Sequence, residues 1–182
     1  IDDATVTPAG QAGVEALVPK RGDGINPEGN ERGHRSDPGG PSWVANVSKG
    51  RYTWWTNKPG EDVLQYRFMV PGRYRLWISW GAGDSSHTTD AQYLLDADGD
   101  LATKQDQQVI AEVDQQRFAD GSGKVPGKAL WSGFYDAGVH RLGTSSVLIL
   151  RGGKTGAAIT ADVVLLESVP GGSGELPQLR QP

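Results

Sequence analysis

The strongest constraint on the fold is the alternation of apolar and polar residues across positions 63–80, VLQYRFMVPGRYRLWISW. Apolar side chains occupy every second position on either side of the Pro71-Gly72 pair: Leu64, Tyr66, Phe68, Tyr74, Leu76, Ile78 and Trp80. Successive side chains of a strand point to opposite faces. The stretch therefore predicts two β-strands joined at a Pro-Gly corner, each with one face on a core and one toward solvent.

The rest of the chain repeats this pattern in shorter form. An apolar cluster at residues 43–47 (WVANV) opens the regular part of the chain, and eight or nine short β segments, among them residues 91–95 (AQYLL) and 109–113 (VIAEV), are separated by Gly- and Pro-containing turns. No stretch has a convincing 3.6-residue period. Evenly spaced short strands without helices predict an all-β fold, an antiparallel jelly-roll-like β-sandwich.

The domain organisation follows from where the regular pattern begins and ends. Residues 1–42 form a loop-rich N-terminal arm that we expect to pack on the sandwich, since long irregular segments are uncommon inside compact domains. Residues 43–168 form the sandwich. Residues 169–182 have the composition of a C-terminal linker.

Charge and composition exclude several classes of function. The chain has 18 basic and 22 acidic residues, a net charge of −4, and no basic stripe, which argues against nucleic acid as a partner. No apolar run approaches the roughly 20 residues that cross a bilayer, so no membrane partner is expected. Cysteine is absent, which excludes disulfides, thiol catalysis and thiolate metal sites.

The order of the segments resembles a known family between Trp43 and Glu167. The markers are PGRY at residues 71–74, DQQ at 114–116 and AD at 161–162. Together with RYTWW and LWSGFYDAG, this order is similar to the golvesin C-terminal-like domain and to the sandwich modules behind xanthan-lyase-type enzymes. The resemblance implies a galactose-binding-like sandwich that serves as an accessory module of an exported protein. The long N-terminal arm and the acidic insert near Asp96 depart from the family pattern.

The resemblance also bears on location and partners. It implies a secreted, cell-surface or periplasmic protein. The expected partners are a polysaccharide or other glycan and further domains of the same chain.

Tryptophan supplies the best functional signal, with six in 182 residues. Indole rings stack on the apolar faces of sugars, while flanking polar groups bind the hydroxyls. Trp77 falls on the arginine face of its strand, Trp55 is out of phase with its apolar neighbours, and Trp131 follows a lysine-containing loop. We predict these three as sugar-stacking residues, with Arg75 and His87 as polar partners.

Not every aromatic side chain is expected on the surface. Tyr52, Trp54 and Trp80 keep phase with apolar strand positions and are expected in the core. The N-terminal arm could also fold over Trp77 and bury it.

Acidic residues offer a candidate calcium site. Asp96, Asp98 and Asp100 alternate in DADGD, so that their oxygen atoms could converge on a structural Ca²⁺. The glycine stands at the fourth position rather than the sixth, which argues against a helix-loop-helix calcium loop, and a simple hairpin turn is the alternative. Asp162 on the last expected strand is a further candidate oxygen ligand with Glu15, although it could instead accept backbone hydrogen bonds.

Catalytic motifs are missing from the sequence: there is no G-x-S-x-G, no H-E-x-x-H and no phosphate-binding glycine loop. The leading hypothesis is therefore a non-catalytic carbohydrate-binding accessory module of a secreted multidomain protein. A structural spacer or protein-docking module is the second hypothesis. A polysaccharide lyase or hydrolase is the third, since paired carboxylates are decided by space and not by sequence.

Overall fold

The computed structural model describes residues 14–19, 31–68, 71–123 and 128–173. The described residues form antiparallel strands and one short helix, which confirms the predicted all-β sandwich. The first elements are β1 Val14–Leu17, β2 Glu31–Ser36, α1 Ser42–Ser48, β3 Arg51–Thr56, β4 Asp62–Arg67, β5 Gly72–Ile78 and β6 Gly81–Ala82. The remaining elements are β7 Ala91–Asp96, β8 Gln108–Val113, β9 Leu130–Trp131, β10 Tyr135–Leu142, β11 Val147–Arg151, β12 Ala158–Ala161 and β13 Val164–Ser173.

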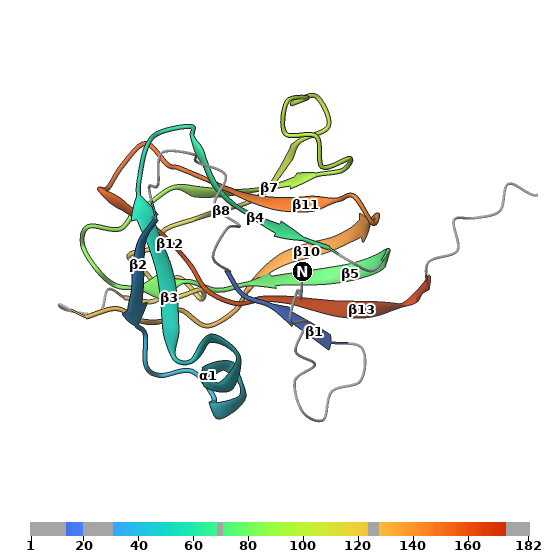
Figure 1. Ribbon diagram of the computed structural model, residues 1–182. Helices are drawn as coiled ribbons and strands as arrows, with labels where there is room; N and C mark the ends of the chain where they lie inside the picture. The colour runs from blue at the N-terminus through green and yellow to red at the C-terminus, as the bar shows by residue number, and fades with distance from the viewer. Residues whose placement is uncertain (1–13, 20–30, 69–70, 124–127, 174–182) are drawn as a thin grey trace, which may run out of the picture.

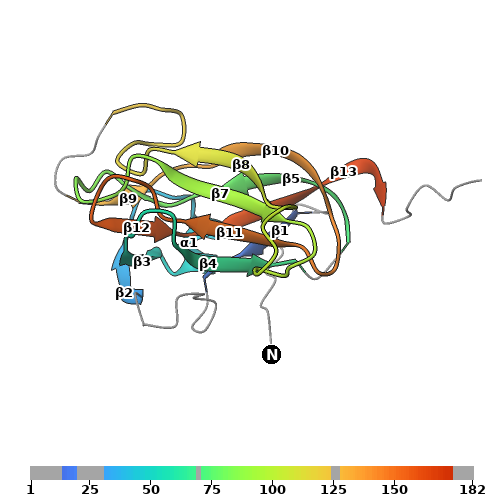
Figure 2. The same ribbon diagram turned by 90° about the horizontal axis from the view of Figure 1, so that it is seen from above.

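Two four-stranded sheets make up the two layers (Figure 1). The first has the order β1-β13-β5-β10 and the second β4-β11-β7-β8. A three-stranded sheet, β12-β3-β2, crosses one end of the molecule, and β6 pairs with β9. Figure 2 shows the same layers from above, with β7 and β11 over β13 and β1.

The main core fills the space between the two large sheets. It contains Leu76 and Ile78 of β5, Leu148 and Leu150 of β11, and Tyr93 of β7, all almost fully buried. Apolar burial of this extent is the dominant stabilising term in such a fold. The outer faces of both sheets carry smaller apolar clusters of their own.

Residues 63–80 form two strands, as predicted, but the strands belong to different sheets. β4 pairs with β11, whereas β5 pairs with β10 and β13. The chain therefore passes from one layer of the sandwich to the other at the Pro71-Gly72 corner. Proline and glycine suit such a corner, because proline fixes φ and has no N–H to place in a ladder.

The apolar cluster at residues 43–47 lies in the helix α1, so the expectation that no stretch has a helical period is wrong. Trp43, Val44 and Val47 lie on the side of this helix that packs on the protein. Their spacing fits a 3.6-residue turn, a signal too short to outweigh the β pattern around it. The helix ends where Lys49 and Gly50 adopt positive φ values of 58° and 59°.

Parts of the expected N-terminal arm belong to the sheets. β1 pairs with β13, and β2 pairs with β3. β13 extends to Ser173, beyond the predicted end of the sandwich. Within the described residues, no helix is long and apolar enough to cross a membrane.

Candidate functional site

The outer face of β5 carries the residues that the alternation placed there. Tyr74, Leu76 and Ile78 are buried in the core, so the intervening Arg73, Arg75 and Trp77 point away from it. We call the surface formed by these three side chains and their neighbours on β10 and β13 the outer β5 face.

Trp77 is half-buried in the middle of this face. In the strand register it lies opposite Leu165 of β13 on one side and Asp136 of β10 on the other. Its indole N–H donates a hydrogen bond of 2.9 Å to the Glu167 carboxylate. The indole therefore combines an apolar ring with acidic groups on both flanking strands.

Arg75 connects these groups. Its guanidinium forms an ion pair with Asp136 and lies 5.8 Å from the centroid of the Trp77 ring. Both side chains of the pair are more than a third exposed, so the ion pair itself contributes little stability. Its main effect is to hold the guanidinium over the indole ring.

Arg73 and Arg141 occupy the far end of the outer β5 face. They are directly opposite each other in the β5–β10 register, and both are exposed. Like charges in a directly opposed pair are unfavourable. No ion pair joins either of them to a carboxylate in the part of the chain that the structure describes.

The other end of the face is apolar and is covered by α1. Trp43 of α1 stacks on Phe134 at 5.7 Å between ring centroids, and Trp131 meets the edge of Phe134 at 5.0 Å. Together with Val44 and Leu165 these rings form one cluster, which we call the α1 cluster. Trp131 is thus a packing residue under α1 and not a free stacking surface.

Trp77 lies at the border of the α1 cluster. The alternative in which the N-terminal arm, residues 1–42, folds over Trp77 and buries it is not confirmed, because Trp77 is half-buried. The element that covers part of the outer sheet face is α1.

Trp55 does not lie on the surface, so the expectation that it opens onto a loop is wrong. Its side chain is 1% exposed and belongs to the main core. The neighbouring Tyr52 is also buried, because Gly81 leaves room for its ring: a Cβ at Gly81 would lie 2.4 Å from Tyr52 Cδ1. A strand buried on both faces lacks the alternation that would assign its inner side.

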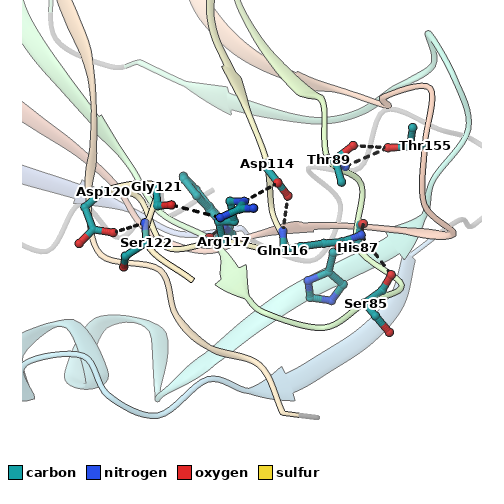
Figure 3. Close-up of polar contacts among 11 residues, drawn as sticks. Ser85, His87, Thr89, Asp114, Gln116, Arg117, Asp120, Gly121, Ser122 and Thr155 are labelled. Carbon is teal, nitrogen blue, oxygen red and sulfur yellow. Dashed lines mark hydrogen bonds and ion pairs between the residues drawn. The ribbon is translucent and has the colours of Figure 1, made fainter. Parts of the chain in front are cut away.

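His87 is likewise buried, at 1% exposed, which contradicts its expected position in a surface loop. The imidazole and the Tyr52 ring pack in a T-shaped arrangement with 5.7 Å between their centroids. Burial lowers the pKa of the imidazole below the usual 6.5. Its backbone carbonyl accepts a 2.8 Å hydrogen bond from the Gln116 side chain (Figure 3). His87 is a structural residue that connects the loop before β7 to the Asp114-Gln115-Gln116 turn.

Trp54, expected in the core, is instead half-buried on the face of β3 that it shares with Tyr52. The Arg35 guanidinium covers its ring at 4.5 Å, a distance typical of a cation–π contact. Sequence reasoning missed this pair because β2 was not predicted. Nothing in the local pattern shows which residue of β2 lies beside Trp54.

The acidic insert gathers three carboxylates, but with Asp106 in place of Asp100. Oxygen atoms of Asp96, Asp98 and Asp106 lie within 4.8 Å of one another and could hold a metal ion. Backbone N–H groups already approach this cluster: Asp106 Oδ2 accepts from Ala97 and Asp98, both at 3.1 Å. The DADGD loop is thus also a turn closed by its own side chains.

Comparison with known proteins gives little identity. No family model matches the chain, and no curated protein does. A solved structure of a Paenibacillus xanthan lyase is similar to it with 20% sequence identity and a TM-score of 0.40. The similarity covers 91% of this chain and 13% of the lyase chain, so the protein spans a small part of that enzyme's length.

Proposed function

We propose that the protein is a non-catalytic carbohydrate-binding module of a secreted multidomain protein, and that it binds glycan on the outer β5 face. The single observation that carries this proposal is the half-buried Trp77, whose indole N–H binds Glu167 and which lies beside the Arg75–Asp136 ion pair. An aromatic ring with convergent polar groups is the arrangement that sugar recognition needs.

The chemistry of binding follows from this arrangement. A pyranose ring would lay its C–H face on the indole, which removes apolar surface of both partners from water. The carboxylates of Asp136 and Glu167 would accept hydrogen bonds from sugar hydroxyls, and Arg75 would donate to ring or hydroxyl oxygens. Because these groups already contact one another, little side-chain entropy is lost on binding.

The charge on the face favours an acidic glycan over a neutral one. Arg73 and Arg141 stand opposite each other, four residues along β5 from Trp77. A guanidinium pair presents planar donors that match a carboxylate. A uronate carboxylate placed between them would relieve the repulsion of the like-charged pair.

The experiment is affinity electrophoresis and calorimetry with a panel of neutral and acidic polysaccharides. We expect Trp77→Ala to weaken binding tenfold or more, which corresponds to about 1.4 kcal/mol. Trp54→Ala is the matched control, because it removes a half-buried indole from a different sheet. No binding to any glycan of the panel, or equal binding by both variants, would refute the proposal.

A spacer or docking module is the second candidate, since a neighbouring domain could cover Trp77 and the apolar α1 cluster. Quenching of tryptophan fluorescence in the full-length protein separates the two. Protection of Trp77 by added glycan supports carbohydrate binding. Protection only by the presence of adjoining domains supports docking.

The proposal includes a structural Ca²⁺ in the DADGD loop, held by Asp96, Asp98 and Asp106. Three clustered carboxylate oxygens are hard ligands suited to this ion. Calcium titration of the protein and of Asp98→Asn measures the contribution of this site. Unchanged calcium binding in Asp98→Asn would argue against an ion in this loop.

A further inference from the structure

Two aspartates far apart in the sequence meet in the interior beside α1. Asp37 follows β2, and Asp162 links β12 to β13. Their side chains are only 2% and 1% exposed. The two carboxyl groups face each other.

The polar surroundings of this pair do not satisfy it. All four carboxylate oxygens of Asp37 and Asp162 are buried without a hydrogen-bond donor within bonding geometry. In the part of the chain that the structure describes, no Lys or Arg forms an ion pair with either residue. Buried carboxylates without donors or counter-charge are costly, because burial removes the water that stabilises the charge.

A contrast within the same protein shows how unusual this is. Asp62, also mostly buried, receives hydrogen bonds from the Arg151 guanidinium. Buried carboxylates in folded proteins are normally compensated in this way. The Asp37–Asp162 pair lacks any such partner among the described side chains.

A shared proton would compensate only half of the pair. Burial raises the pKa of Asp37 to about 7 and also raises that of Asp162. One proton between two carboxylates still leaves a negative charge in apolar surroundings. A cation of charge +2 would compensate both carboxylates at neutral pH.

The surroundings also offer oxygen ligands and room. The Ser48 hydroxyl faces Asp162. A pocket of about 40 Å³, space for one or two water molecules, adjoins Asp37 and is lined by Ser48, Gly50 and Trp131. The remaining lining comes from Pro38, Gly39, Gly40, Val44 and Ala45.

We propose that Asp37 and Asp162 form a divalent cation site of Ca²⁺ type, with the Ser48 hydroxyl, backbone carbonyls and water completing the oxygen shell. Ca²⁺ suits the site better than Mg²⁺, because it accepts six to eight oxygen ligands in irregular geometry, whereas Mg²⁺ requires a near-ideal octahedron. The ion ties the loop before α1 to the link between β12 and β13. It thereby holds α1, and with it the α1 cluster, against the outer sheet face.

The test starts from protein that a chelator has freed of metal. Its melting temperature and the number of calcium ions bound per chain are then measured as Ca²⁺ is added. With free Ca²⁺ about 100-fold above Kd, we expect Tm of the wild type to rise by about 5–10 °C. The double variant Asp37→Asn/Asp162→Asn should lose one bound ion per chain and the part of this response that exceeds the contribution of the DADGD loop, while remaining folded, because asparagine has the same size and no charge. Asp98→Asn is the matched control, because it changes the other acidic cluster.

A second measurement does not depend on stability. Tb³⁺ bound near an indole emits when tryptophan is excited, and Trp131 lines the pocket beside Asp37. We expect sensitised emission from the wild type and from Asp98→Asn, and about tenfold less from the double variant. The proposal is overturned if Ca²⁺ affects Tm equally in the wild type and the double variant, or if Tb³⁺ emission is unchanged by the double substitution.

Discussion

The protein contains two groups of clustered carboxylates, and they differ in what faces them. In the DADGD loop, Asp96 is fully buried, but its oxygens accept from the Gly99 N–H at 2.7 Å and from the Gln107 amide at 2.9 Å. Gln107 in turn accepts from Arg151 at 2.8 Å. The carboxylates of Asp37 and Asp162 are equally buried, and none of their four oxygens accepts a hydrogen bond of good geometry.

The comparison teaches that burial of a carboxylate does not by itself indicate a ligand. A buried carboxylate with its donors in place stabilises the loop that supplies them, as at an Asx turn. A buried carboxylate without donors requires a group from outside the chain or a proton. Removing the charge should therefore have opposite effects on stability in the two places.

The largest effect is expected for Asp96→Ala. This substitution leaves the Gly99 N–H and the Gln107 side chain without their acceptor in a buried position. We expect a loss of about 2–3 kcal/mol in the free energy of unfolding. Urea denaturation in excess chelator measures it, and a loss below about 0.5 kcal/mol would mean that the loop does not depend on Asp96.

Asp37→Asn/Asp162→Asn should have the opposite sign in the same conditions. Without a cation, the wild type carries an uncompensated buried charge at neutral pH, and the double variant does not. We expect the variant to be more stable than the wild type by about 1–2 kcal/mol in chelator. Destabilisation by a similar amount would show that the carboxylates make favourable contacts of their own.

The pH dependence sharpens the same contrast in chelator. The pKa of Asp37 is raised from 3.8 in the unfolded chain to about 7 in the folded protein. The folded state therefore holds a proton that the unfolded state has lost, and stability falls as pH rises between these values. The stability gap between double variant and wild type should widen by about 1 kcal/mol between pH 5 and pH 6. A constant gap would contradict the raised pKa.

The smallest effect is expected for Asp98→Asn. Asp98 is exposed, and its Oδ1 accepts a 2.8 Å hydrogen bond from the Asp100 N–H, which an asparagine oxygen can also accept. In chelator we expect a change below about 0.5 kcal/mol in the free energy of unfolding. A larger loss would show that the turn depends on the charge of Asp98.

Several features of the candidate site could be predicted from local pattern. Strict alternation in β5 placed Arg75 and Trp77 on the outer face, because a strand covered on one side only shows a clean period of two. The DADGD loop was visible as an acidic turn for a similar reason, since Asx turns involve neighbours in sequence.

Other features could not be predicted, because distant segments decide them. Trp55 is buried in the main core and His87 against Tyr52 of β3, and their own flanking residues carry no trace of that packing. Asp106 lies beside Asp96 and Asp98 because the loop between β7 and β8 closes on itself, and Glu167 lies beside Trp77 because of the β5–β13 register.

By itself, the sequence determined the class of fold, the β5 surface and the absence of thiol chemistry, because these depend on residue type and on a two-residue period. Only the tertiary structure brought Asp37 to Asp162 across 125 positions of chain and placed α1 over Trp131. The physical reason is that a carboxylate's charge is compensated by whatever lies beside it in space. In a sandwich whose strands pair across long sequence separations, those neighbours are set by topology.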